Sequence, residues 1–359
     1  MRRFFSSVIV LILALSGFLY QVRLAGELPN VRDMLPLACG LLLFAAFSII
    51  FSGGRIRMLL ARPWLYYVFA MVLLAALVVF GRRYRGGIYL PGRINPSELV
   101  KLLFVLFAAG YLARAHELHG RLTIRSMAVL AAAFGGLALE IAVIHDFGLM
   151  AQLVLTLTAM LFAASWGWGI AAFAGVVVAA VTAAMHPIGH LAVRFAVWRD
   201  PFSDMTGTGW QTLQGLTALV SGGWWGKGMG MGEVHAVPIV SSDFVYAALA
   251  EEVGLAGCLI LLALWGLFFV MSLYPHIRGQ SPERFPASDS RSQHSGYPTS
   301  LLAVGLVSSL AIQLLLNVAG VLNTLPMTGI TLPLLSHGGS SILAVLMMCG
   351  LLNAMREGD

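Results

Sequence analysis

Long apolar runs recur along the whole chain, and shorter polar segments separate them. Most of these runs are 18 to 24 residues long, and an apolar α-helix needs about 20 residues to cross the hydrocarbon core of a bilayer. Because only a helix pairs its own main-chain groups there, the pattern predicts an all-α polytopic membrane protein, a single domain over residues 1–359. The predicted transmembrane helices, about ten, cover residues 4–22, 35–52, 63–81, 95–113, 124–144, 148–165, 169–186, 244–273, 299–322 and 337–355.

The composition excludes a soluble protein. Of the 359 residues, 59% are hydrophobic and 11% are charged, whereas about a quarter are charged in an average soluble domain. Residues 4–22 lack a small-residue cleavage site, so they predict a first membrane helix rather than a signal peptide. Cys39, Cys258 and Cys349 fall inside apolar runs, so they predict no disulfide or metal site. The net charge of +6 is scattered over loops, which favours membrane topology over nucleic-acid binding.

Basic residues in the loops predict the orientation, because inner loops of membrane proteins carry more Arg and Lys than outer loops. With the N-terminus inside, the inner segments hold twelve arginines and the short outer loops hold six. Both termini are therefore predicted to be cytoplasmic. The large loop at about 187–243, between the seventh and eighth helices, is predicted to be extracellular, and the polar loop at about 275–298 to be cytoplasmic.

Four of those six outer arginines lie in one short loop, RRYRGGIYLPGR at residues 82–93. The orientation rule disfavours such a cluster outside, so the cluster indicates an anionic partner such as a phosphate. Ordinary lipid head groups or an acidic partner protein would explain the same charges, and the charges alone do not decide between these partners.

The segment NPSELVKLL opens the fourth predicted helix. Asn95 can cap this helix, Pro96 suits its first position, and Glu98 completes a capping box with Asn95. Lys101 lies about one turn inside the apolar run, where a charge indicates a functional or ion-paired residue. Glu251 and Glu252 lie about 12 Å along the eighth helix from Asp243, at about 1.5 Å per residue, where ionised carboxylates need partners. A buried salt bridge, for example with Lys101, and a role in chemistry are both open.

Two aspartates lie at predicted outer helix starts. Asp146, beside His145, is interpreted as a helix-start carboxylate that favours the positive end of the helix dipole. Asp243 follows Ser241 and Ser242, one of which would cap the eighth helix and place Asp243 in its first turn. A helix-dipole role would explain Asp243 without any chemistry.

Glycine, tryptophan and proline mark the outer loops. The run SGGWWGKGMGMG at 221–232 allows a tight backbone near a ligand or a re-entrant segment, and Trp224 and Trp225 are either interfacial aromatics or sugar-stacking residues. The run NTLPMTGITLPLLSHGGSS at 323–341 combines helix breakers with leucines. This combination predicts irregular backbone buried against protein or a cavity, followed by Ser340 and Ser341 as caps of the last helix.

Several of these segments together resemble one family. They are NPSELVKL at 95–102, HDFGLMAQL at 145–153, DPFSDMTGTGWQ at 200–211, SGGWWGKGMG at 221–230, SSDFVYAALAEEVGLAG at 241–257 and LPMTGITLPLLSHGGSS at 325–341. Their order and spacing resemble the SEDS family (shape, elongation, division and sporulation), typified by RodA and FtsW.

The resemblance implies a peptidoglycan glycosyltransferase in the bacterial cytoplasmic membrane. Such a protein polymerises lipid II into a nascent glycan strand on the outer face and works with a class B penicillin-binding protein. The resemblance assigns the catalytic aspartate to Asp243, which would act as general base. It assigns substrate binding to matched or neighbouring residues: Arg85, Glu98, Lys101, Gln211, Lys227 and Ser340. No cofactor is recognisable, and a divalent cation shared with a substrate diphosphate is left open.

The sequence departs from the family pattern just before Asp243. The family has a Pro-Glu-Ala-His-Thr-Asp run where residues 238–243 read PIVSSD, so the family's Glu and His are absent. Two other functions therefore stay open: a flippase for lipid-linked precursors, which would use the same charged residues, and a non-catalytic scaffold for a penicillin-binding protein.

Overall fold

The computed structural model describes residues 2–26, 31–84, 87–91, 94–119, 122–165, 189–237, 240–278 and 297–355. The helices of these residues are α1 (Arg2–Ala25), α2 (Val31–Ile50), α3 (Ile56–Leu60), α4 (Pro63–Phe80), α5 (Ser97–His119), α6 (Ile124–Ile144), α7 (Phe147–Ser165), α9 (Gly189–Arg199), α10 (Thr208–Gly222), α11 (Val245–Arg278), α13 (Tyr297–Val321) and α14 (Gly339–Ala354). Two 3-10 turns, η1 (Pro201–Ser203) and η2 (Val234–Ala236), and the strands β1 (Arg82–Tyr84) and β2 (Gly87–Tyr89) complete the fold.

The helical membrane architecture agrees with the sequence. Eight of the described helices are long and apolar enough to cross a membrane, and α14 is a shorter apolar helix. These nine helices match nine of the predicted segments, and the segment predicted at 169–186 lies outside the described residues. The large loop contains two helices, α9 and α10. The loop predicted at 275–298 begins later, because α11 continues through Pro275 to Arg278, and residues 279–296 are outside the description.

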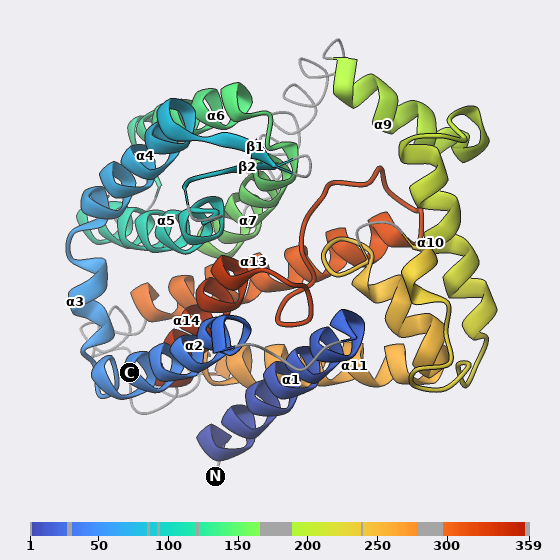
Figure 1. The fold of residues 1–359 in the computed structure, drawn as a ribbon. Helices are drawn as coiled ribbons and strands as arrows, with labels where there is room; N and C mark the ends of the chain where they lie inside the picture. The colour runs from blue at the N-terminus through green and yellow to red at the C-terminus, as the bar shows by residue number, and fades with distance from the viewer. Residues whose placement is uncertain are drawn as a thin grey trace.

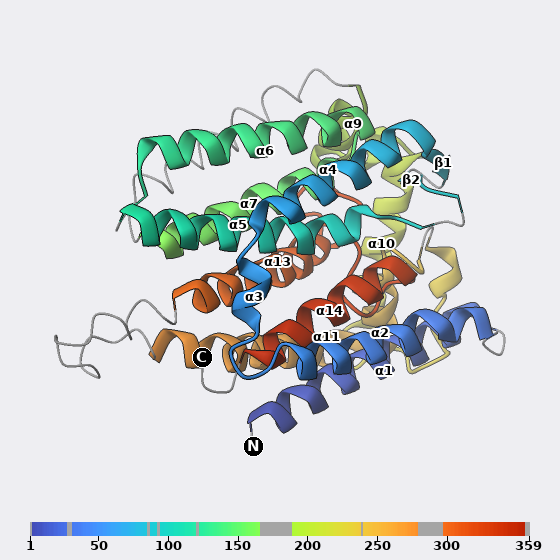
Figure 2. The ribbon, with the colours of Figure 1, turned by 90° about the vertical axis from the view of Figure 1, so that its left-hand side faces the viewer.

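Helix α13 lies at the centre of the bundle. It packs against α5 and α7 on one side and against α11 on the other, and Figure 1 shows α4 to α7 on one side of it with α1, α2 and α14 opposite. Both termini lie toward one end of the bundle, away from the β1–β2 hairpin (Figure 2). In this hairpin Arg82 pairs with Tyr89, and the strands are antiparallel.

The burial of α5 and α13 follows from their sequences. Both helices are apolar around most of their circumference, which is typical of helices surrounded by others. In the most apolar stretch of each helix, 78% of the residues of α5 and 72% of those of α13 are buried. Their few polar side chains therefore lie away from water and need partners inside the protein. These polar side chains, which include Lys101, Gln313 and Asn317, form much of the site described below.

Helix α11 breaks at Gly254, which has φ 70° and ψ −176°. The segment after α10 pairs with the broken helix. The N–H groups of Lys227 and Gly228 donate to the carbonyls of Glu251 and Glu252 at 2.9 and 3.0 Å. A Cβ on Gly226 would collide with the carbonyl of Glu252. The glycines of this segment thus permit close approach to α11.

A glycine in α1 tests the packing of the bundle. A Cβ on Gly17 would collide with the main-chain carbonyl of Leu334, so we expect Gly17→Ala to cost about 1–3 kcal/mol and lower the melting temperature. Gly266, in α11, has no atom within 4 Å of such a Cβ, so Gly266→Ala is the matched control, with a change below about 1 kcal/mol. Thermal unfolding in detergent measures both, and equal melting temperatures would contradict this packing.

Candidate functional site

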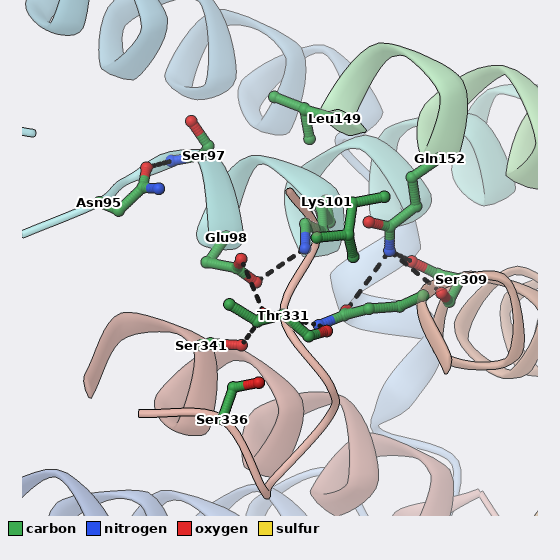
Figure 3. Close-up of polar contacts among 12 residues, drawn as sticks. Asn95, Ser97, Glu98, Lys101, Leu149, Gln152, Ser309, Thr331, Ser336 and Ser341 are labelled. Carbon is green, nitrogen blue, oxygen red and sulfur yellow. Dashed lines mark hydrogen bonds and ion pairs between the residues drawn. The ribbon is translucent and has the colours of Figure 1, made fainter. Parts of the chain in front are cut away.

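Lys101 and Glu98 form a buried ion pair in the first turns of α5. The ammonium of Lys101 lies 2.8 Å from Oε2 of Glu98, and the Lys101 residue is only 3% exposed (Figure 3). The suggested pairing of Lys101 with Glu251 is therefore wrong. The i,i+3 spacing lets the pair form within one helix, so the charge of Lys101 is paired with a carboxylate of α5 itself.

The predicted capping box at the start of α5 does not form. Oδ1 of Asn95 accepts a hydrogen bond from the N–H of Ser97, but the N–H of Asn95 donates to Oγ of Ser340 at 3.0 Å. Ser340 takes the contact that a capping box assigns to Glu98, which leaves the Glu98 carboxylate to Lys101. Ser340 thus joins α14 to the start of α5, while Gly338 is the N-cap of α14 and provides no side-chain cap.

Residues 327–332, which we call the strap, run between α13 and α14 past this ion pair. The hydroxyl of Thr331 donates to Oε1 of Glu98 at 3.5 Å and lies 3.0 Å from Oγ of Ser341. The side-chain amide of Gln313 donates to the carbonyl of Thr331 at 3.1 Å. The irregular backbone predicted here thus packs against protein at residues 330–332, where the carbonyls of Ile330 and Thr331 and the N–H of Leu332 have side-chain partners.

Asp243 lies beside Gly329 of the strap. It precedes α11, which begins at Val245, so the predicted position in the first helical turn is wrong by two residues. The side-chain amide of Asn317 donates to the main-chain carbonyl of Asp243 at 3.0 Å and to that of Ile330 at 2.7 Å. Ser336 holds the preceding carbonyl, that of Ser242, at 2.6 Å. The backbone around Asp243 is therefore fixed by α13 and the segment after the strap.

Arg194, in α9, joins the site near Asp243. Its Nη1 donates to the carbonyl of Met327 at 3.0 Å. Gly329 lies close to both charges: a Cβ there would stand 3.7 Å from Oδ2 of Asp243 and 3.9 Å from Nη2 of Arg194. The sequence interpretation missed Arg194 because it counted this residue only as a loop charge, although an arginine within the apolar run HLAVRFAVW was a usable signal.

The surroundings of Asp243 change its acidity. Burial raises the pKa of Asp243 above its ordinary value, while a hydrogen bond with Ser242 and the charge of Arg194 act in the opposite direction. Burial also raises the pKa of Asp146. The hydrogen bond from Leu149 and the positive charges of Lys101 and Arg194 lower this pKa and partly offset the effect of burial.

Asp146 links the two halves of the site electrostatically. Its Oδ1 accepts the N–H of Leu149 at 3.0 Å, as expected of a carboxylate at a helix start. Its charge also interacts with Lys101 and with Arg194. Both Lys101 and Arg194 are therefore near enough to Asp146 for their charges to favour its ionised form.

Two further ion pairs support the large loop. Nζ of Lys227 lies 2.6 Å from Oε1 of Glu251, and Nη2 of Arg23 lies 2.7 Å from Oε1 of Glu252. The same Glu251 oxygen accepts the N–H of Glu233 at 3.1 Å. The hydrogen bond to Glu251 raises the pKa of Lys227. The predicted substrate-binding residue Lys227 is thus engaged with α11.

The remaining predicted residues are placed less directly. Gln211 lies in α10 one turn before Gly215, and a Cβ on Gly215 would stand 2.6 Å from the ring of Phe244. Gln211 therefore shares the α10 face that packs beside Asp243. Arg85 lies outside the described residues. Within the part of the chain that the structure describes, no group of three or more His, Cys, Asp or Glu side chains could hold a metal ion.

Comparison with known proteins gives concordant results. The sequence pattern of the FtsW, RodA and SpoVE family, described as cell cycle protein, matches residues 4–358. The chain is 31% identical over 327 residues to a probable peptidoglycan glycosyltransferase FtsW of Aliivibrio salmonicida, with 87% of this chain and 77% of the relative covered. It is 38% identical over 169 residues to the peptidoglycan glycosyltransferase RodA of Mycobacterium tuberculosis, covering 47% of this chain but only 33% of that relative.

Solved structures share the fold. A chain from a structure titled as structural coordination of polymerization and crosslinking by a peptidoglycan synthase complex matches with a TM-score of 0.74 and 25% identity, covering 99% of this chain and 98% of that one. The rod shape determining protein RodA of Thermus thermophilus matches with a TM-score of 0.66 and 22% identity, over 99% and 97% of the two chains. At that identity the second likeness concerns the fold alone.

The ion pair of α5 allows a stability test. Lys101→Met leaves the buried Glu98 without its cation, so we expect a loss of about 3–5 kcal/mol. The double variant Lys101→Met with Glu98→Gln removes both charges and should recover most of that loss. Thermal unfolding in detergent compares the two variants. If the single and the double variant melted at the same temperature, Glu98 and Lys101 would not be coupled as described.

Proposed function

Because the chain belongs to the FtsW, RodA and SpoVE family of cell cycle proteins, we propose that it is a peptidoglycan glycosyltransferase that polymerises lipid II. The observation that carries the proposal is the arrangement around the strap. The carboxylate of Asp243 and the guanidinium of Arg194 both lie close to Gly329, and the Lys101–Glu98 pair contacts Thr331, two residues further along the strap. A base and fixed cations are the groups that transfer of a sugar from a diphosphate requires.

In the proposed reaction Asp243 acts as general base. Its carboxylate takes the proton of the 4-hydroxyl of the incoming N-acetylglucosamine, and the hydroxyl oxygen bonds to the anomeric carbon of N-acetylmuramic acid in the donor strand. The bond from that carbon to the diphosphate breaks, and its electron pair leaves with polyprenyl diphosphate. Direct displacement of this kind inverts the anomeric centre from α to β. The raised pKa of Asp243 strengthens it as a base at neutral pH.

The leaving diphosphate gains negative charge, which fixed cations stabilise in the transition state. Arg194 is the first candidate, since its bond to the neutral carbonyl of Met327 leaves its charge unbalanced there and it lies near Gly329, as Asp243 does. Lys101 is the second. It is paired with Glu98, which contacts Thr331 of the strap. The arginine-rich hairpin, including Arg85, would gather the anionic substrates before reaction. Gln211, on the α10 face beside Asp243, would contact the sugars.

The proposed setting is the bacterial cytoplasmic membrane, with both termini cytoplasmic. The end of the bundle with the hairpin, α9 and α10 then faces outward, where lipid II and the nascent glycan strand would meet Asp243. A class B penicillin-binding protein is the proposed partner, because the similar structure of a peptidoglycan synthase complex couples polymerization to crosslinking. A divalent cation, if needed, would bind between the substrate diphosphate and a carboxylate of the site.

The flippase and scaffold alternatives make different demands on the site. A flippase must open the site to each side of the membrane in turn, whereas hydrogen bonds from Gln313 and Asn317 tie the strap to α13. A scaffold needs no ionisable group beside Gly329. A base opposed to an arginine therefore favours catalysis.

Polymerisation by the purified protein tests the function. With labelled lipid II and a cognate class B partner, the wild type should form long glycan strands. Asp243→Ala should lower the rate at least about 100-fold, because a positioned base contributes about 10²–10⁴-fold. Asp200→Ala, which removes an exposed turn carboxylate of the same loop, is the matched control and should retain activity. Equal rates for wild type and Asp243→Ala would leave the scaffold as the better explanation.

The pH dependence follows from the pKa of Asp243. Only the ionised carboxylate is a base, so the rate should fall as pH drops through the raised pKa. Arg194 lowers that pKa, so Arg194→Gln should move the acidic limb of the rate profile to higher pH. Arg194→Lys keeps the charge and should leave the limb closer to that of the wild type. Superimposable acidic limbs for Arg194→Gln and wild type would show that Arg194 does not act on the base.

A further inference from the structure

Three polar residues form a stripe along one face of α13. Ser309, Gln313 and Asn317 are spaced by four residues, so they lie above one another on the helix, and each is only 1% exposed. Polar side chains this deep in an apolar bundle are costly unless they are paired. Their partners come from other elements: Gln152 of α7 donates to the carbonyl of Ser309 at 3.1 Å (Figure 3).

Asn317 is bonded to both the site aspartate and the strap. Its side-chain amide donates to the carbonyls of Asp243 and Ile330 at 3.0 and 2.7 Å. A carbonyl can only accept, so these two contacts fix which end of the amide is the nitrogen. The opposite atom, Oδ1, is buried and has no partner among the described residues. The amide nitrogen of Asn317 is thus bonded to two carbonyls, while its oxygen stays without a partner in the part of the chain that the structure describes.

Gln313 makes the equivalent contact one turn away. Its side-chain amide donates to the carbonyl and to the hydroxyl of Thr331, at 3.1 and 3.2 Å. That hydroxyl contacts Oε1 of Glu98, whose other oxygen holds Lys101. Figure 3 shows the part of this chain that runs from Thr331 through Glu98 to Lys101. Two successive turns of α13 thus hold the adjacent strap residues Ile330 and Thr331.

We infer that Asn317 and Gln313 are positioning residues that set the separation between Asp243 and the Lys101–Glu98 pair. This inference rests on the proposed function. Each residue acts on a different part of the reaction. Asn317 orients the base toward the acceptor hydroxyl and toward Arg194, whereas Gln313 places Thr331, and through it Glu98 and Lys101, for the lipid-linked diphosphate. A displacement of about 1 Å at a reacting group lowers a rate by as much as about 100-fold.

A merely structural role for the stripe predicts different behaviour. Buried amides that only satisfy main-chain carbonyls would, when removed, lower stability and reduce the amount of folded protein. The folded fraction would then work with unchanged KM and an unchanged pH profile. The positioning role predicts that the two variants differ from each other in kind, because one residue holds the base and the other holds the cation pair.

Steady-state kinetics of glycan polymerisation on the full chain with its partner separates these cases. The variants are Asn317→Ala, Gln313→Ala and the shape-conserving Thr331→Val, measured on monodisperse protein of known folded fraction. Ser308→Ala is the matched control, because the Ser308 hydroxyl bonds only to the carbonyl of Gly305 in its own helix among the described residues.

We expect Asn317→Ala to lower kcat at least about tenfold with little change in KM. It should also move the acidic limb of the rate profile to higher pH, because Asp243 moves away from Arg194. Gln313→Ala and Thr331→Val should raise KM for lipid II about fivefold or more and leave the acidic limb in place. Ser308→Ala should stay within twofold of wild type. A wild-type acidic limb in Asn317→Ala, or a wild-type KM in Gln313→Ala, would overturn the inference.

Binding of lipid II tests the positioning role separately from polymerisation. A wild-type protein that forms no glycan with an active partner would overturn the proposed function. Equilibrium binding of lipid II to the same variants would still test whether Gln313 positions the cation pair. Gln313→Ala should then bind lipid II about fivefold or more weakly than Ser308→Ala, and equal affinities would overturn the inference even so.

Discussion

Hydrogen bonds from buried amides to main-chain carbonyls hold the candidate site together. Inside an apolar bundle a main-chain group without a partner is costly, and the strap has no regular secondary structure to pair its own groups. Asn317 and Gln313 supply donors to two neighbouring carbonyls of the strap. Because Asn317 also holds the carbonyl of Asp243, the pairing that stabilises the strap also fixes the aspartate. The stability and the geometry of the site therefore depend on the same contacts.

The charges of the site divide into balanced and opposed groups. Lys101, Lys227 and Arg23 each have a carboxylate within 2.8 Å, so each forms an ion pair within the protein. Arg194 instead donates to a neutral carbonyl, and its charge lowers the pKa of Asp243. An anionic substrate that entered beside Gly329 would lie close to this cation. The absence of a side chain at position 329 leaves room for such a substrate.

The helices could be predicted from the sequence, but the pairing of the charges could not. Apolar run length decided nine membrane helices, because burial in a bilayer depends on local composition. Lys101 was identified as a significant charge for the same reason. Its partner was predicted wrongly, because the sequence assigned Glu98 to a capping box. In the structure Ser340, 245 residues from Asn95, accepts the N–H of Asn95 instead, and Glu98 pairs with Lys101. Arg194 was missed because its partner Met327 lies 133 residues away in the chain. The catalytic role of Asp243 was predicted from family resemblance alone, since its local sequence is equally consistent with a helix-dipole carboxylate.

Binding of lipid II to Asp243→Asn, compared with the charge-balanced double variant Lys101→Met with Glu98→Gln, separates the role of the base from that of the cations. Asp243 is assigned the chemical step, and the cations around the strap are assigned diphosphate recognition. Asp243→Asn should therefore bind lipid II with nearly wild-type affinity and form no glycan, whereas the double variant should lose affinity. Normal glycan formation by Asp243→Asn, or wild-type affinity in the double variant, would contradict this division of roles.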